Sequence, residues 1–200
     1  DAIGNLIASR WPIIRSEVRQ LPHADSGEYR SATAALIETP DGQLPFMCTH
    51  LNWKFEHGYV REQQVYALAE FLREWTRDTT LPPVIVGDFN AEPDAAEIRF
   101  LTGLQSMHGQ SLYLQDAWRV AGDGSIGYTW DNTNPYAAIV HEPNRRIDYI
   151  FVGLADATTG RGQIKSTTLA WHQATNAIYP SDHFGPVSYT HLTLPTSVIV

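Results

Sequence analysis

An amphipathic helix followed at once by an apolar strand is the feature that most constrains the fold of this chain. Val65, Leu68, Leu72 and Trp75 recur at spacings of three and four, which predicts a helix over residues 60–77. The run 83–86, Pro-Val-Ile-Val, is typical of a strand covered on both faces. A helix that leads into such a strand favours an α/β fold.

Other segments extend this pattern without any internal repeat. The runs 34–39 and 44–51 predict a hairpin around the turn residues 40–43. A proline and acids at 92–97 predict the start of a short helix, with Gly103 as its stop. Residues 146–152 and 166–171 are further strand candidates, and Arg61 is expected on the solvent face of the long helix. The chain is therefore expected to form one α/β unit.

The composition is typical of a folded chain, and the net charge disfavours some classes of binding partner. The 200 residues are 43% apolar and 18% charged, enough to bury a core within one domain or a large piece of one. A net charge of −8 disfavours a surface that follows nucleic-acid phosphates. The single cysteine, Cys48, excludes an internal disulfide and a multi-cysteine zinc site. No membrane-spanning run or signal peptide is apparent, although the sequence opens with Asp1 and not with Met.

Polar residues collect where the expected strands end. Asp88 and Asn90 follow the apolar run directly, and strand alternation turns both to one side with Phe89 on the other. Ligands commonly bind at the carboxyl ends of strands in open α/β sheets. The alternative is that Asp88 and Asn90 only shape the turn into the next helix.

Three more polar positions have both a structural and a catalytic interpretation. His50 closes an apolar strand, where a histidine often serves packing alone. Asp148 lies inside an apolar strand and needs a partner, which Arg145 or Arg146 would supply in the structural interpretation. Asp182 and His183 adjoin in a polar turn, a pair that also arises by chance.

Taken together, these pieces resemble a known family. The order is THL at 49–51, a helix, GDFN at 87–90, RIDYIF at 146–151 and SDHFG at 181–185. It resembles the endonuclease/exonuclease/phosphatase superfamily, which includes deoxyribonuclease-like enzymes, abasic-site endonucleases, inositol-polyphosphate phosphatases, deadenylases and neutral sphingomyelinases. Residues 4–13, GNLIASRWPI, also resemble a strand of that family. The resemblance implies a four-layer α/β sandwich of two packed mixed sheets with outer helices, incomplete at its amino-terminal end.

The resemblance also implies a role for each matched residue. His183 is expected to be the general base that activates water, and Asp148 the carboxylate that orients its ring. His50 is expected to donate a hydrogen bond to a phosphoryl oxygen. Asp88 and Asn90 are expected to position water and phosphate. These five residues are expected to meet at one end of the sheets, with Asp148 hydrogen-bonded to His183.

A metal and a substrate contact follow from the same resemblance. Asp182, Asp88 and Asn90 are the expected metal ligands, and oxygen ligands of this kind suit Mg²⁺ or Mn²⁺. Trp130, in a segment that resembles the family's GxTW run, is a candidate to stack on substrate, with core packing as the alternative. For Trp118 core packing is favoured. Residues 132–144 are expected to form a mobile loop at the rim of the cleft.

Both ends of the sequence depart from the family pattern. The family's first asparagine and its metal-binding Gln-Glu pair have no counterpart, so the chain is expected to begin within the domain and to hold metal weakly. Residues 187–196 read like the translation of a sequencing-library adapter, although a genuine closing strand is the alternative. We therefore expect a partial family domain over 1–186 and a non-native read-through tail over 187–200.

The function predicted is hydrolysis of a phosphoester by a divalent-metal-dependent enzyme. The substrate is expected to be a small or lipid-linked phosphoester, because the acidic balance does not favour nucleic acid. A deoxyribonuclease-like or abasic-site nuclease is the first alternative. A non-catalytic homologue that uses the fold as a binding module is the second. The sequence indicates neither a compartment nor an oligomeric state.

Overall fold

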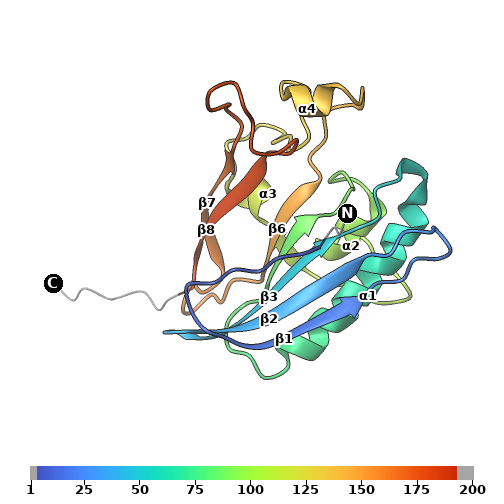
Figure 1. The fold of residues 1–200 in the computed structure, drawn as a ribbon. Helices are drawn as coiled ribbons and strands as arrows, with labels where there is room; N and C mark the ends of the chain where they lie inside the picture. Colours follow the sequence, from blue (N-terminus) through green and yellow to red (C-terminus); the bar gives the residue numbers. More distant parts are fainter. Residues whose placement is uncertain (1–3, 193–200) are drawn as a thin grey trace.

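The computed structural model describes residues 4–192, and the last eight residues of the expected tail lie outside this range. Six strands form one sheet in the order β1-β2-β3-β4-β6-β5, and two more pair separately (Figure 1). The large sheet contains β1 (Ile13–Gln20), β2 (Ser31–Thr39), β3 (Gly42–His50), β4 (Val84–Asp88), β5 (Leu114–Asp116) and β6 (Asp148–Gly153). It is mixed, because β3 and β4 are parallel and the other pairs are antiparallel. Among the described helices, none is long and apolar enough to cross a membrane.

Two helices cover one face of this sheet. They are α1 (Gly58–Thr76) and α2 (Ala96–Leu101), and a single 3-10 turn, η1 (Phe55–His57), precedes α1. Leu68 and Phe71 of α1 are fully buried, and they share a core with Phe89 and Phe151 from the sheet side. The expected amphipathic helix is therefore present, and its apolar face packs as the 3.6-residue period requires.

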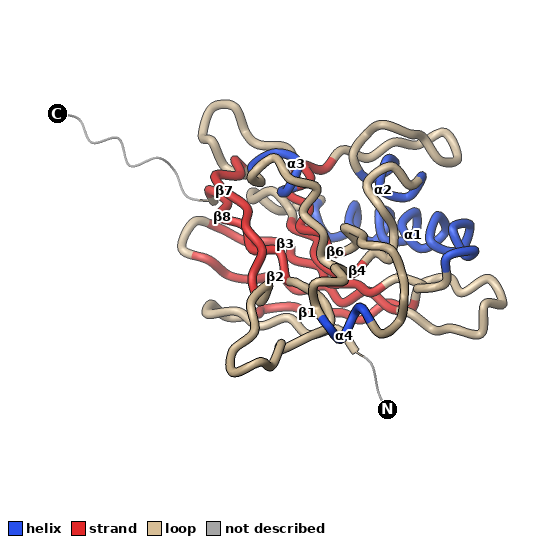
Figure 2. Tube along the Cα trace, turned by 90° about the horizontal axis from the view of Figure 1, so that it is seen from above, coloured by secondary structure: helices blue, strands red, loops and turns tan. Residues whose placement is uncertain are grey.

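The opposite face carries a small antiparallel sheet of β7 (Gln163–Ala170) and β8 (Gly185–His191). Ile164 of β7 joins Val84 and Val152 of the large sheet in a second buried cluster. The helix α3 (Ala117–Ala121) packs on β7, and α4 (Pro135–Ala138) lies near the top of Figure 1. Figure 2 shows α1 and α2 on one side of the large sheet and β7 and β8 on the other. The expected α/β fold, with two sheets and outer helices, is confirmed.

Two expectations about local structure are wrong. Of residues 4–13, expected to form a strand, 4–12 have no hydrogen-bonded ladder with a neighbour in the described chain, and only Ile13 belongs to a strand, as the first residue of β1. Residues 4–9 cross the sheet as an extended segment, with the Asn5 side-chain amide donating to the Ser31 carbonyl at 2.8 Å. Arg61 is buried and not solvent-facing, because it points toward α2, where its Nε lies 2.6 Å from a carboxylate oxygen of Glu97.

The expected rim loop, residues 132–144, contains α4 and is tied down by its own polar side chains. Asn134 accepts the Tyr136 amide at 3.0 Å as the cap of α4, and its amide group donates to the Ser181 carbonyl at 2.8 Å. Asn132 donates to the Glu142 carbonyl at 2.8 Å. These contacts link the loop to the turn that carries the predicted catalytic histidine.

The start of the expected tail pairs within the small sheet. Val187, Ser188 and Tyr189 lie opposite Thr168, Thr167 and Ser166 in antiparallel register. A β-prone segment fills a free sheet edge whether or not it is native. The division at residue 187 therefore stays a prediction.

Candidate active site

Strand register brings three of the predicted site residues side by side. His50 ends β3 and is the register partner of Asp88 at the end of β4. Asp88 is in turn the partner of Asp148 at the start of β6. Because β6 runs antiparallel to β4, its first residue lies at the same sheet edge as the last residues of β3 and β4. His50 Nε2 is 3.4 Å from a carboxylate oxygen of Asp88.

His183 reaches this row from the loop before β8. Its Nδ1 lies 2.8 Å from Oδ2 of Asp148, the hydrogen bond that was expected. Thr129, fully buried, connects the two segments: its hydroxyl accepts the Asp148 amide at 3.1 Å, and its carbonyl accepts the Phe184 amide at 2.7 Å. The loop is thus held so that the ring meets the carboxylate.

The alternative partners of Asp148 are engaged elsewhere. Arg146 forms two hydrogen bonds to the buried carboxylate of Asp116, at 3.1 and 2.8 Å. Arg145 pairs with Glu142. Within the described chain, Asp148 therefore has His183 and not an arginine as its ionic partner.

The GDFN turn has both structural and site-forming features. Phe89 is buried in the core beneath α1 and α2, whereas Asp88 and Asn90 line the cleft, as strand alternation predicted. Asn90 has a positive φ of 50°, and its amide group donates to the Leu51 carbonyl at 3.1 Å. Its backbone N–H donates to Asp88 at 2.8 Å, so the two residues also make the turn.

Gly87 allows β4 to approach β3 closely just before Asp88. Its φ is +144°, and a Cβ built there would lie 1.9 Å from the carbonyl oxygen of Thr49. Only a residue without a side chain fits this contact. The glycine therefore sets the spacing between the strands that carry His50 and Asp88.

His50, Asp88, Asn90 and His183 line a cleft of about 200 Å³. Trp130 forms one wall, with 8% of its surface exposed and its ring edge-to-face with His183 at 5.0 Å between centroids. Five further residues line the cleft although no site role was predicted for them: Arg30, Trp53, Glu142, Arg145 and Ile147. Arg145 adjoins the RIDYIF motif and was considered only as an ion-pair partner, whereas no motif marks Arg30.

The local charges alter the pKa values of three site residues. Burial lowers the pKa of His50 to about 4, and the nearby Arg30 charge acts in the same direction. Burial, together with the charge of Asp148, raises the pKa of Asp88 to about 7. For His183 burial acts to lower the pKa, but the hydrogen bond and charge of Asp148 outweigh it and raise the pKa to about 9. At neutral pH His50 is therefore uncharged, and without a cation beside Asp88 and Asp148 the His183 ring carries a proton. A cation held by these two carboxylates would lower the pKa of His183, which a general base at this position requires.

One group of residues has the spacing of a metal site. Ligand atoms of Asp88, Asp148 and His183 all lie within 4.8 Å of one another. Asp182, predicted as a ligand, is exposed and lies outside this group, with its carboxylate accepting the Ser181 hydroxyl at 3.2 Å. The structure brings the other five predicted residues together and leaves Asp182 at the rim.

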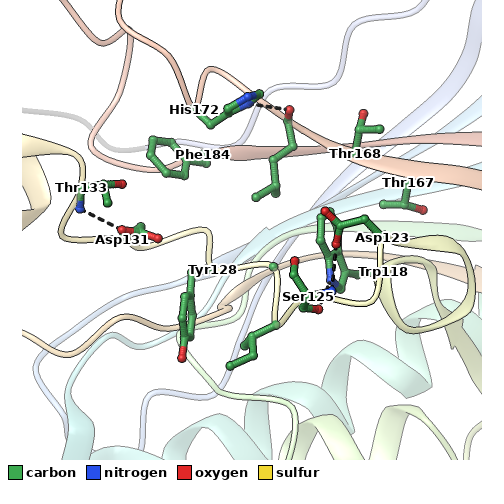
Figure 3. A pocket seen from close by; sticks show the side chains of 13 residues that line it. Trp118, Asp123, Ser125, Tyr128, Asp131, Thr133, Thr167, Thr168, His172 and Phe184 are labelled. Atoms are coloured by element: carbon green, nitrogen blue, oxygen red, sulfur yellow. Dashed lines mark hydrogen bonds between the residues drawn. The ribbon is translucent and has the colours of Figure 1, made fainter.

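A larger cavity of about 730 Å³ lies between the small sheet and the loop after α3 (Figure 3). Trp118 lines it, half-buried, and donates to the Ser125 carbonyl at 3.0 Å. The acids here shape their own loops: Asp123 accepts the Ser125 amide at 2.9 Å and Asp131 the Thr133 amide at 2.8 Å. The acidic and histidine side chains grouped around Asp88 lie in the smaller cleft, which is therefore the candidate active site.

The chain belongs to the Endonuclease/Exonuclease/phosphatase family, whose sequence model matches residues 1–183. This membership confirms the resemblance carried by the motifs. No curated protein matches the chain in sequence.

Solved structures share the fold at low sequence identity. Truncated TDP2 of Caenorhabditis elegans is 21% identical over 90% of this chain, with a TM-score of 0.66. A functionally unknown conserved protein of Enterococcus faecalis is 21% identical over 90%, with a TM-score of 0.67. A mannosyl-6-phosphatase of Bacteroides thetaiotaomicron is 20% identical over 89%, with a TM-score of 0.64. The chain spans 66% of the length of each of these three chains.

Proposed function

We propose that this chain hydrolyses phosphoesters with the help of a divalent metal ion, using His183 oriented by Asp148 to activate water. The observation that carries the proposal is the 2.8 Å contact between His183 and Asp148, next to the partly buried carboxylate of Asp88. A histidine held by a carboxylate beside a second acid suits proton transfer from water. The family membership supports the same class of reaction.

The cleft residues have complementary tasks in this proposal. Asp148 fixes the ring of His183 through Nδ1, which leaves the other ring nitrogen to exchange a proton with water. His50, neutral at pH 7, is able to donate one hydrogen bond to a phosphoryl oxygen without adding charge. Arg30 and Arg145 also line the cleft, and although each is paired with a carboxylate, of Glu28 and Glu142, each has an Nε without a partner and is proposed to contribute to binding of the phosphate. Trp130 packs against His183 and restricts its movement.

The acidic residues fit a divalent cation. Burial and the neighbouring Asp148 make the ionised form of Asp88 costly, and positive charge at this position would offset that cost. Asp88 and Asp148 would hold the ion with oxygen ligands of the kind that Mg²⁺ and Mn²⁺ prefer, and Asn90 and Asp182 are proposed to assist. The ion would neutralise charge on the phosphoryl group.

The test is hydrolysis of 4-nitrophenyl phosphate and bis-(4-nitrophenyl) phosphate with Mg²⁺ or Mn²⁺. His183→Ala should lower kcat by a factor on the order of 10² or more, because a general base acts on the transition state. The thermal unfolding midpoint, checked in parallel, should show that the variant remains folded. Wild-type turnover by folded His183→Ala would exclude this mechanism.

A further inference from the structure

The loop that joins β7 to β8, residues 171–184, carries His183 and is mostly at the surface. Residues 171–178 are all exposed, so this β7–β8 loop has little packing of its own to hold it. Directly after His183, the Phe184 amide donates to the Thr129 carbonyl at 2.7 Å. This contact fixes the loop after the histidine, and a second contact is needed to fix it before the histidine.

Asn134 of the rim loop makes that second contact. Its side chain is fully buried, and its amide group donates to the Ser181 carbonyl at 2.8 Å, two residues before His183. Ser181 is in turn bonded to the histidine, because its hydroxyl oxygen accepts the His183 amide at 3.1 Å. A hydrogen-bonded path therefore runs from Asn134 through Ser181 to the backbone of His183.

The donor group of Asn134 is separate from its role as a helix cap. The side-chain oxygen caps α4 by accepting the Tyr136 amide at 3.0 Å, and Asp or Ser would cap the helix as well. A carboxylate, however, cannot donate, and the shorter Ser side chain has one oxygen for both contacts. The contact to Ser181 therefore accounts for an amide side chain at this cap.

The helix that Asn134 caps is itself held in place, so its cap is a fixed point for the β7–β8 loop. Figure 1 shows α4 and this loop at the same end of the molecule. Ala137 is fully buried in a small cluster with Trp130 and Ile147, which both line the catalytic cleft. The ring of Tyr136 lies edge-to-face with that of Tyr179 in the β7–β8 loop, 6.4 Å between centroids. The helix thus contacts both the wall of the cleft and the loop.

We propose that Asn134 is a positioning residue, which holds the β7–β8 loop through Ser181 so that the His183 ring stays against Asp148. The inference rests on the proposed role of His183 in the reaction. Without the Asn134 donor, the loop remains attached at Thr129 but is free to shift ahead of the histidine. A displacement of about 1 Å at a reacting group costs on the order of 10²-fold in rate. Because one attachment remains, we expect a smaller loss, on the order of 10-fold in kcat.

The test is Asn134→Ser, which keeps an oxygen to cap α4 and removes the donor to Ser181. With bis-(4-nitrophenyl) phosphate, or 4-nitrophenyl phosphate if only that ester is hydrolysed, kcat should fall on the order of 10-fold while KM changes less than about twofold. The Phe184 amide should exchange with solvent on the order of 10 times faster, as measured by NMR, because the loop opens more often. Asn134→Asp, which also caps α4 but cannot donate, should lose activity in the same way.

The matched control is Gln115→Ala, at the other end of β6 from Asp148. Gln115 is also an amide side chain that donates to backbone carbonyls, those of Gly153 and Gly162, at 2.7 and 3.0 Å. Its loss should lower the thermal unfolding midpoint, as the loss of a partly buried hydrogen bond does, but leave kcat and the Phe184 exchange rate unchanged.

Three results would overturn the inference: unchanged kcat in both folded Asn134 variants, a raised KM with unchanged kcat, or an equal loss of kcat in Gln115→Ala. If the wild type hydrolyses neither ester, the proposed reaction fails on its own. Faster exchange at Phe184 in Asn134→Ser but not in Gln115→Ala would then still support Asn134 as the residue that holds the loop, and equal exchange in the two variants would overturn it.

Discussion

The contact between Asp148 and His183 predicts a measurable change in one histidine when Asp148 is replaced. In metal-free protein His183 is expected to titrate at about 9, against an ordinary value of 6.5. Because a tenfold change in proton affinity is worth about 1.4 kcal/mol, this difference corresponds to roughly 3 kcal/mol in favour of the charged ring. In Asp148→Asn the hydrogen bond to the charged ring is weakened and the carboxylate charge is lost. The His183 midpoint should then fall to 6.5 or below, because burial lowers the pKa of the ring once Asp148 no longer opposes it.

The assay is an NMR titration of the imidazole C2 protons in EDTA, with the His183 signal identified by its loss in His183→Gln. Asp78→Asn serves as the control and should not move the midpoint. A His183 midpoint that stays above about 8 in Asp148→Asn would refute the assignment of the shift to this carboxylate.

The same contact sets a pH dependence of stability. A raised pKa in the folded state means that the folded protein binds more protons than the unfolded chain between pH 6.5 and about 9. The stabilisation is therefore complete below pH 6.5 and is lost as the pH rises through 9. Urea unfolding should show the stability gap between wild type and Asp148→Asn closing by about 2–3 kcal/mol over that range. A gap that widens with pH would contradict the sign.

Three more outcomes are expected. Phe89→Ala should lower the free energy of unfolding by about 3–5 kcal/mol in urea titrations, because the ring is fully buried, and a loss below about 1 kcal/mol would be inconsistent with its packing. Asp116→Ala should cost about 3–5 kcal/mol because it leaves buried Arg146 unpaired, whereas Asp123→Ala on an exposed loop should cost far less. Mg²⁺ or Mn²⁺ should raise the thermal unfolding midpoint of the wild type but not of Asp88→Asn, and an equal rise in both would place the ion elsewhere.

The sequence predicted correctly those elements whose residue pattern is local to the element itself. The helix over 60–77 and the strand at 83–86 follow from apolar spacing, and both are present as α1 and β4. The side of the chain to which Phe89 turns follows from the two-residue period of a strand. The motifs also named five residues that the structure brings together.

What the sequence did not indicate depends on contacts between distant segments. Arg61 is separated from Glu97 by 36 positions, so nothing local distinguishes it from the solvent-facing charges of α1. Arg30 lies in the cleft because of the path of the chain before β2, and Glu142 because Asn132 and Asn134 hold the rim loop. The extended segment 4–9 has the alternating exposure of a strand but lacks a paired neighbour in the described range.

The strand register that aligns His50, Asp88 and Asp148 also makes misaligned forms of the active site unstable. If β4 slipped by one residue, Phe89 would enter the polar cleft and the carboxylate of Asp88 would enter the apolar core. Both changes carry a large penalty, because one exposes an aromatic ring and the other buries a charge without a partner. A molecule with a misaligned site is therefore also a molecule with a damaged core, and it is disfavoured during folding. The correct site geometry is enforced by the same apolar residues that hold the sheet against α1 and α2.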